Sequence, residues 1–395
     1  MKRVLYITSF LPYDTPFAGS KTSYRILKSI AKGYNINLLS FCTEVEEKYV
    51  DDFKNFCEDK NNINLIDIIK VNKFTRIFNS LVLFFLPAFL VARFYFKNLI
   101  SLKKEYDFIY VDWSQSIFFG YMLSKILNIP IVYSIADIIT QSLERKYKEE
   151  KNFLKKLIFR FEYFKTKSIE KKLLDSGRLI VVQSAKDKSI LVNMKIEGEK
   201  ILVIAPYFNQ DMIFVEKSSK EDNFNILFWG AMNRLENIDA VEYYLSTFHE
   251  QLKLEIQNYR FVIAGANPSK TIVEKYQNDK TVYITGFIDD PSEIFNISHI
   301  SVVPLRLGAG IKVKTLESLY MGLPTIATDI GAEGIYLNDS NGLYVENDED
   351  LFLEKILSVY KGYQNINKKN IHERIRTLFD FDKSLQEIEI HLKNI

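Results

Sequence analysis

Residues 301–328 have the sequence SVVPLRLGAGIKVKTLESLYMGLPTIAT, in which a short apolar run and a helical pattern flank a glycine-containing stretch. The apolar run Ile300–Val303 predicts a buried strand that ends at Pro304. The spacing of apolar residues over Val313–Tyr320 predicts a helix, which the segment Gly322-Leu323-Pro324 ends. A glycine-containing loop joins this strand to this helix.

The loop and the start of the helix favour a bound diphosphate. Glycines at a strand-to-helix turn let the backbone approach a ligand closely. The helix N-terminus offers unpaired N–H groups and about half a positive charge. Arg306, Lys312 and Lys314 add cations beside the Gly308–Gly310 backbone, and Glu317 is placed to accept hydrogen bonds from sugar hydroxyls. From residue types alone, the alternative is an ordinary solvated basic face.

Short apolar runs alternate with helical stretches on both sides of this segment, which predicts parallel strands covered on both faces. The expected strands are Val4–Phe10, Ile36–Phe41, Phe108–Val111, Ile129–Ser134, Leu179–Gln183, Asn225–Trp229, Arg260–Ala264, Val282–Thr285, Ile300–Val303, Thr325–Ala327 and Gly342–Val345. The simplest fold is α/β, with two Rossmann-like, doubly wound domains facing a central cleft. Ligands in such sheets bind at the carboxyl ends of the strands.

The pattern is interrupted once, so the boundaries follow from it. We expect an N-terminal domain over residues 1–205, a polar linker at 206–223, a second domain at 224–372, and a C-terminal helix at 373–395 that packs back on the N-terminal domain.

Composition excludes several classes. The chain has 395 residues, with 52 Lys and Arg against 50 Asp and Glu, so its formal net charge of +2 argues against a nucleic-acid-binding protein. Two cysteines and four scattered histidines argue against a disulfide scaffold and a metal centre. The start of the chain lacks the features of a signal peptide, so we expect a cytoplasmic protein.

Two stretches leave membrane contact open. Residues 77–92 are strongly apolar but shorter than the ~20 residues that span a bilayer, so they predict a buried helical hairpin or an interfacial segment. Residues 146–172 carry ten basic side chains against four glutamates, with phenylalanines at helical spacing. A peripheral helix at the inner face of the membrane and a solvated helix both fit this pattern.

The motifs resemble those of a known family. The run P-L-R-x-G-A-G-I-K-x-K-x-L-E-S-L-x-M-G-x-P-x-I-A-T-x-x-G-x-E-G, from Pro304 to Gly334, resembles the donor site of retaining glycosyltransferases of family 4, which have the GT-B fold. Phe228–Met232, Phe261–Pro268 and Thr285–Asp290 resemble further donor-domain segments in the same order. The first half of the chain matches the acceptor domain only in outline.

The resemblance implies transfer of a sugar from a nucleotide diphosphate sugar, UDP- or GDP-linked, to a hydroxyl of a glycan or lipid-linked glycan acceptor. It implies retention of the anomeric configuration and no metal ion or other cofactor. Gly286–Ile288 would line the base, Glu317 would hold the ribose, and the leaving phosphate would take the acceptor's proton. The donor residues it implies are Gly230, Arg234, Gly286, Phe287, Ile288, Arg306, Gly308, Ala309, Gly310, Ile311, Lys312, Lys314 and Glu317.

The sequence departs from the family pattern at one site. Ala309 stands eight residues before Glu317, where the E-x7-E motif has its first glutamate. A subset of the family carries a GAG-I-K loop here, and this chain resembles that subset. A non-catalytic partner of another transferase stays an alternative for this reason, and a nucleotide-sugar epimerase is a second one.

On the acceptor side we expect Gly19 and Ser20, in the loop before the first helix, and Asp137, after the strand Ile129–Ser134. Asp137 could orient the acceptor hydroxyl, so with Lys314 and Glu317 it completes the expected catalytic set. The alternative for Asp137 is a helix cap. Glu162 and Glu170 are expected to pair with neighbouring basic side chains.

Overall fold

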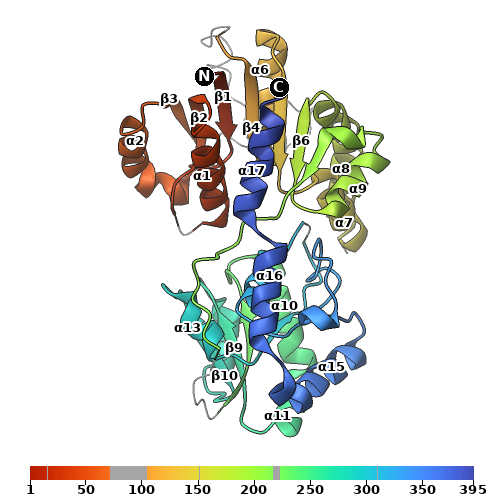
Figure 1. Cartoon of the computed structure of the whole chain (residues 1–395). Coiled ribbons are helices and arrows are strands. Elements are labelled where there is room, and N and C mark those ends of the chain that lie inside the picture. The colour runs from red at the N-terminus through yellow and green to blue at the C-terminus, as the bar shows by residue number, and fades with distance from the viewer. Residues whose placement is uncertain (16, 72–104, 151, 217–222, 309) are drawn as a thin grey trace. The chain divides into compact units, whose positions relative to one another are not determined.

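A computed structural model describes residues 1–15, 17–71, 105–150, 152–216, 223–308 and 310–395. The expected hairpin at 77–92 and the donor residue Ala309 therefore lie outside the described residues. The chain divides into two compact units, coloured by residue number in Figure 1. Unit 1 is Met1–Tyr207 with Phe381–Ile395, and unit 2 is Phe208–Asp380.

Unit 1 contains a seven-stranded parallel sheet in the order β3-β2-β1-β4-β5-β6-β7. Most side chains of its central strands are fully buried, because helices cover both faces of the sheet. The strands are β1 (Arg3–Thr8), β2 (Asn35–Thr43), β3 (Ile63–Val71), β4 (Phe108–Asp112), β5 (Ile131–Ile135), β6 (Leu179–Val182) and β7 (Ile201–Val203).

The helices of unit 1 bury apolar stripes against the two faces. One core contains side chains of α1, α2 and α17, and the other contains side chains of α6, α7, α8 and α9. The described helices are α1 (Ala18–Ala31), α2 (Val50–Glu58), α6 (Ile117–Leu127), α7 (Ile139–Glu149), α8 (Phe153–Asp175), α9 (Ala185–Asn193) and α17 (Phe381–Leu392), with short 3-10 helices at Glu44–Tyr49, Ser114–Ser116 and Gly198–Lys200. Arg25 of α1 pairs with Asp382 of α17 at 2.9 Å, so the last helix belongs to unit 1.

Unit 2 contains a six-stranded parallel sheet in the order β10-β9-β8-β11-β12-β13, which is the Rossmann order. Its strands are β8 (Phe224–Trp229), β9 (Tyr259–Ala264), β10 (Val282–Gly286), β11 (Ile300–Val303), β12 (Thr325–Ala327) and β13 (Leu343–Val345). Its helices are α10 (Leu235–Thr247), α11 (His249–Glu255), α12 (Lys270–Tyr276), α13 (Pro291–Asn296), α14 (Val313–Tyr320), α15 (Glu349–Gly362) and α16 (Lys368–Leu378), with 3-10 helices at Asp339–Asn341 and Tyr363–Asn365.

The predicted elements around the diagnostic segment are confirmed: β11, β12 and α14 have the bounds expected from the sequence. Two strands were not expected. β3, at the edge of its sheet, has a polar residue at every third position, namely Asn64, Asp67 and Lys70, and β7 has only three residues. Within the stretch expected to be a linker, Phe208 and Met212 are buried in the core of unit 2.

The basic segment around residue 160 forms two helices, not one. α7 ends at Glu149 and α8 starts at Phe153, and α7 packs along α8 in a hairpin. Glu170 of α8 is fully buried and accepts hydrogen bonds from the N–H groups of Ile139 and Thr140 at 2.8 and 2.9 Å. It also accepts the hydroxyl of Thr140, and burial raises the pKa of Glu170 to about 7.

The expectation that Glu170 pairs with a basic neighbour is therefore wrong, whereas Glu162 does pair with Lys165. Glu170 instead supplies acceptors for the unpaired N–H groups at the start of α7. Sequence periodicity does not predict this contact, because the contact joins positions about 30 residues apart across a helix hairpin.

The hairpin contact predicts a large effect for a single substitution. Glu170→Ala leaves three buried donors of α7 without this acceptor, so we expect the free energy of unfolding to fall by about 2–4 kcal/mol. Glu144→Ala, which breaks only the surface pair of Glu144 with Lys148, should cost less than about 1 kcal/mol. Urea unfolding measures both, and equal effects would contradict the capping role.

Candidate functional site

The expected donor loops meet at one place in unit 2. β8 and β11 are neighbours in the sheet. After β8 the chain continues to β9 on one side of this pair, and after β11 it continues to β12 on the other side. Their following loops, at 230–234 and 304–312, both start from the carboxyl edge of the sheet. This is the topological switch point, where open α/β sheets bind ligands.

Two glycines let the loop after β8 pack against the loop after β9 and against α14. Gly265, after β9, has a φ of +141°, and a Cβ there would lie 2.0 Å from the carbonyl oxygen of Gly230. Gly230 has a φ of +156°, and a Cβ there would lie 2.9 Å from the Lys314 ammonium nitrogen. The backbone after β8 is therefore held in direct contact with the backbone after β9 and with the first turn of α14.

Lys314 is the cation most affected by this packing. Its Nζ donates a hydrogen bond to the Asn237 side-chain oxygen and lies 4.7 Å from the centre of the Phe228 ring. Burial, together with the positive charges of Arg234 and Lys312, lowers the pKa of Lys314 to about 7. Lys314 is therefore a cation that titrates near neutral pH, at the start of a helix.

Arg306 has an acidic partner within unit 2. Its guanidinium donates to both carboxylate oxygens of Asp239, at 3.1 and 2.6 Å, and lies 4.3 Å from the centre of the Tyr243 ring. This bidentate pair fixes the orientation of a half-exposed cation beside the loop. An incoming anion would share this guanidinium with Asp239.

Lys312 and Glu317 are both held by contacts that the sequence did not predict. The buried Lys312 donates to the carbonyl of Gly310 at 2.6 Å and lies 3.4 Å from a Glu333 carboxylate oxygen. The Glu317 carboxylate accepts the indole N–H of Trp229 at 2.8 Å and the backbone N–H of Asn209 at 3.3 Å.

The other expected donor residues lie on the same edge of the unit 2 sheet. The carbonyl of Gly286 accepts the N–H of Gly265 at 3.1 Å, which joins the β10 loop to the β9 loop, and Phe287 is exposed after it. Arg234 occupies the N-cap position of α10, and its side chain pairs with Glu236 at 2.8 Å. The remaining described members, Ile288, Gly308, Gly310 and Ile311, are in loops that follow β10 and β11.

The expected acceptor residues are in unit 1, and two of them are placed differently from the prediction. Gly19 and Ser20 belong to the first turn of α1, not to the preceding loop. Ser20 is buried and donates to Glu46 at 2.5 Å. Asp137 does not cap α7, because the N-cap is Ile138. It accepts the hydroxyl of Ser114 at 2.9 Å.

The switch point of the unit 1 sheet, between β1 and β4, holds residues that sequence reasoning missed. Asp112, at the end of β4, is buried and accepts hydrogen bonds from Ser23 and Tyr6. Burial raises its pKa to about 7. The next residue, Trp113, has a φ of +76°, which is unfavourable for a bulky side chain and is typical of functional sites. Its ring meets Phe10 edge-on at 5.1 Å.

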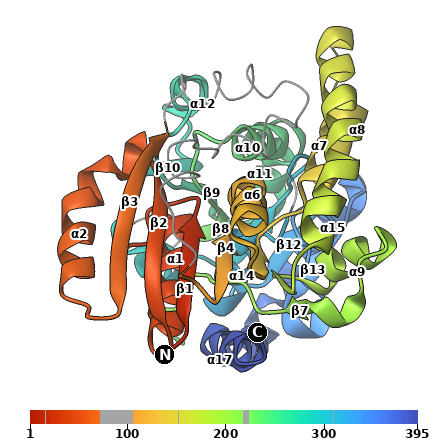
Figure 2. The ribbon, with the colours of Figure 1, turned by 90° about the horizontal axis from the view of Figure 1, so that it is seen from above.

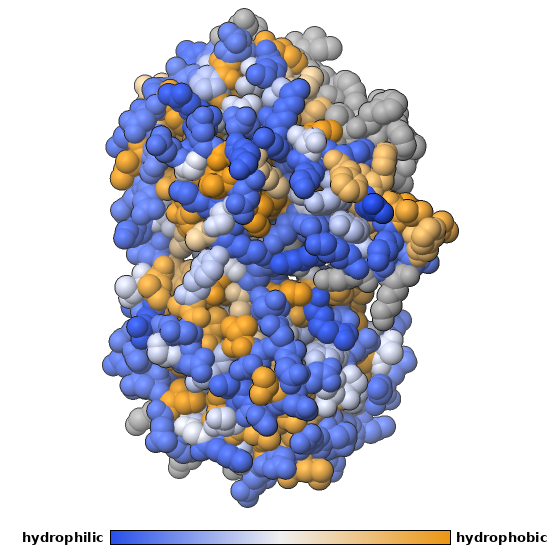
Figure 3. Space-filling view, turned by 90° about the vertical axis from the view of Figure 1, so that its right-hand side faces the viewer, coloured by the Kyte–Doolittle hydropathy of each residue, from blue (hydrophilic) through white to orange (hydrophobic). Residues whose placement is uncertain are grey.

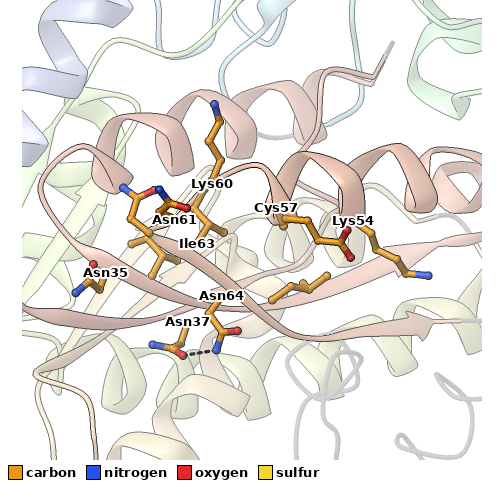
Figure 4. A pocket seen from close by; sticks show the side chains of 12 residues that line it. Asn35, Asn37, Lys54, Cys57, Lys60, Asn61, Ile63 and Asn64 are labelled. Atoms are coloured by element: carbon orange, nitrogen blue, oxygen red, sulfur yellow. Dashed lines mark hydrogen bonds between the residues drawn. The ribbon is translucent and has the colours of Figure 1, made fainter.

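Two other features lie away from these edges. In unit 2, His249, Glu250 and Asp279 come together, but His249 is hydrogen-bonded through both ring nitrogens, to Tyr259 and Asp279. In unit 1, a hollow of about 580 Å³ is lined largely by asparagines and lysines of β2, α2, β3 and the loop between α2 and β3 (Figure 4). It includes the start of β2, the opposite end of that strand from the carboxyl edge, and contains none of the expected residues.

Comparisons with known proteins agree with this geometry. Residues 223–362 match the family model described as Glycosyl transferases group 1. A protein of Klebsiella pneumoniae, described as an uncharacterized 44.6 kDa protein in the cps region, is 22% identical over 381 residues, or 93% of each chain. The family match spans the β8, β9, β10 and β11 loops described above.

Solved structures share the fold over the whole length. HepE of Anabaena, solved with UDP, has a TM-score of 0.69 at 14% identity and full coverage of both chains. The same protein has been solved with UDP-glucose. WaaG, a glycosyltransferase involved in lipopolysaccharide biosynthesis, has a TM-score of 0.66 at 16% identity, covering 98% of this chain and 99% of its own.

These findings confirm the predicted fold, an α/β GT-B architecture of two Rossmann-like domains. Together with the family match, they support the predicted class of protein, a GT-B glycosyltransferase. The sequence identities are too low to carry more than the fold from the solved structures to this chain.

The contact between the glycine loops is the first point to test. Gly265→Ala places a methyl group against the Gly230 carbonyl, so we expect the free energy of unfolding to fall by more than about 2 kcal/mol. Gly362→Ala, where a Cβ meets no atom within 4 Å, is the matched control and should stay close to the parent. Thermal unfolding compares the two, and an unchanged melting temperature for Gly265→Ala would contradict the packing.

Proposed function

We propose that this protein is a retaining glycosyltransferase that moves a sugar from a nucleotide diphosphate sugar, UDP-linked in first choice, to a hydroxyl of a glycan or lipid-linked glycan. The observation that carries the proposal is the gathering of glycine backbone, three basic side chains and the start of α14 at the switch point of the unit 2 sheet. The family match over residues 223–362 and the fold shared with the UDP-binding HepE support it.

The donor diphosphate would lie at the start of α14. Backbone N–H groups at the start of α14, with Gly308 and Gly310 beside them, would donate to its oxygens. Lys314 would become fully protonated as the anion arrives, because a nearby negative charge raises the pKa of an ammonium group. Arg306 and Lys312 would extend this positive field from their positions beside Asp239 and Glu333.

The chemistry follows from where the charge develops. When the bond between the anomeric carbon and the phosphate oxygen breaks, negative charge grows on the leaving diphosphate. The helix N-terminus and Lys314 stabilise that charge without reorganising, so we propose a reaction that needs no metal ion. The acceptor hydroxyl attacks the anomeric carbon from the face that the phosphate leaves, so the configuration is retained. The proton of this hydroxyl passes to an oxygen of the leaving phosphate.

Specific groups would orient the rest of the donor. Glu317, held by the Trp229 indole, would accept the ribose hydroxyls, and the backbone of Gly286–Ile288 would line the base. A positioned carboxylate binds a diol better than a mobile one, because less rotamer entropy is lost on binding. Trp229 is thus a positioning residue for Glu317.

Unit 1 would supply the acceptor-side groups. Asp137 is partly exposed and would orient the acceptor hydroxyl, with Gly19 and Ser20 at the start of α1 as further members. We add Trp113, whose strained backbone holds its ring at the carboxyl end of β4, as a surface for an acceptor sugar. The cps-region relative and the role of WaaG support an acceptor in cell-surface polysaccharide synthesis.

The titration of Lys314 gives a pH test of donor binding. In the free protein the pKa of Lys314 is about 7, and a bound diphosphate raises it, so binding takes up a proton. The affinity for UDP should therefore fall as pH rises above 7, by up to about tenfold for each pH unit. Lys314→Met should bind more weakly and lose this dependence, whereas Lys361→Met, an exposed control on α15, should keep it.

Isothermal titration calorimetry between pH 6 and 9 measures this effect. Identical pH profiles for Lys314→Met and the parent would contradict a role for Lys314 in holding the diphosphate.

A donor screen tests the reaction itself. With a panel of nucleotide sugars, release of the free nucleotide identifies the donor, and Lys314→Ala and Glu317→Ala should each reduce transfer by about 100-fold or more while the fold stays intact. Glu354→Ala, an exposed glutamate of α15, is the matched control. Unchanged rates in both site variants would refute the site, and UDP binding without turnover of any donor would favour the non-catalytic partner.

A further inference from the structure

The first half of α8 exposes an unusual set of apolar side chains. Six large residues of this one helix are between 46% and 72% exposed, namely Phe153, Leu154, Leu157, Ile158, Phe161 and Phe164. Figure 2 shows the start of α8 extending away from the strands of unit 1. Figure 3 shows apolar surface gathered on the projecting right-hand edge of the molecule, where α8 lies.

These side chains form one continuous face. At 100° per residue, the six positions fall within an arc of about 140° around the helix. The side chains that α8 buries lie outside this arc, on the opposite side of the helix; they are Tyr163, Thr166, Glu170, Leu173 and Leu174. The apolar face therefore points away from unit 1, and the core of that unit does not explain it.

Basic side chains flank this face. From Phe153 to Lys167 the helix has five basic residues and one glutamate, a net charge of 5 − 1 = +4. Lys165 lies over the ring of Phe161 at 4.8 Å, and Arg160 over that of Phe164 at 5.9 Å. The single glutamate, Glu162, pairs with Lys165.

We infer that the exposed face of α8 binds the surface of an anionic lipid membrane. A helix with an aromatic and aliphatic face and flanking lysines or arginines inserts that face at the boundary between headgroups and acyl chains. Anionic headgroups attract the flanking cations. None of the described helices is long and apolar enough to cross a bilayer, so the contact is peripheral.

The charges argue against a second copy of the chain as the occupant. Two copies that met through this face would bring Lys155, Lys156 and Arg160 of one α8 near the same residues of the other. Like charges at such an interface disfavour it, whereas a membrane rich in anionic lipid neutralises all of them.

The hairpin makes this surface preformed. Glu170 joins the second half of α8 to the start of α7, and Leu173 and Leu174 bury the end of α8 in unit 1. The helix need not fold on the membrane, so little ordering entropy opposes binding. This inference stands on α8 alone and does not depend on the proposed transferase activity.

Vesicle flotation with the full chain tests the inference. We expect binding to vesicles of phosphatidylglycerol and phosphatidylethanolamine, little binding to phosphatidylcholine vesicles, and weakening by 0.5 M salt. Replacing Phe153, Leu154 and Ile158 by serine should reduce binding at least tenfold. Replacing Lys155, Lys156 and Arg160 by glutamate should reduce it at least 100-fold, since each cation contributes about fivefold.

Matched controls use exposed residues of unit 2. Leu235→Ser with Leu254→Ser controls for apolar loss, and Lys361→Glu, Lys369→Glu and Arg374→Glu together control for charge. Circular dichroism and melting temperature confirm that the variants fold. Parent protein that fails to bind anionic vesicles, or serine variants that bind like the parent, would overturn the inference, as would a dimer that the α8 substitutions convert to monomer without vesicle binding.

Discussion

The pairing of β8 with β11 in the middle of the unit 2 sheet positions the proposed donor site. Parallel strands release their following loops at the same edge, and at this point the loops diverge, so a ligand can enter between them. The contact of Gly265 with the Gly230 carbonyl then leaves no room for a side chain between two backbones. A Cβ at Gly230 would in turn lie 2.9 Å from the Lys314 ammonium nitrogen, so the glycine backbone after β8 also packs against a side chain of the first turn of α14.

Each cation at this edge already has a polar partner. Arg306 contacts Asp239, Lys312 contacts Glu333, and Lys314 contacts the neutral amide of Asn237. Burying an uncompensated positive charge is costly, which is why Lys314, whose partner is uncharged, has the lowered pKa. These cations are thus close to electrically balanced by their partners when Lys314 is neutral, and a bound anion would favour the protonated form of Lys314.

Unit 1 uses buried carboxylates as organisers of its backbone. Glu46 accepts the N–H groups of Leu11 and Thr43, and Glu170 accepts those at the start of α7. Each carboxylate also joins segments that are far apart in the sequence, since Glu46 contacts Leu11 and Glu170 contacts Ile139. Because Glu170 anchors one half of α8, the other half stands exposed with its apolar face outward, which is the basis for the proposed membrane contact.

The sequence alone determined the alternation of strands and helices, the bounds of β11, β12 and α14, and the collection of glycine and basic residues between them, because these depend on neighbours in the chain. It did not reveal the β3 edge strand, whose mixed pattern lacks a continuous apolar run, or the strained Trp113. It also misassigned Glu170 and placed Gly19 and Ser20 in a loop. Only the tertiary structure decided which partners Arg306, Lys314 and Glu317 contact, since Asp239, Asn237 and Trp229 reach them through strand order and loop packing rather than through sequence spacing.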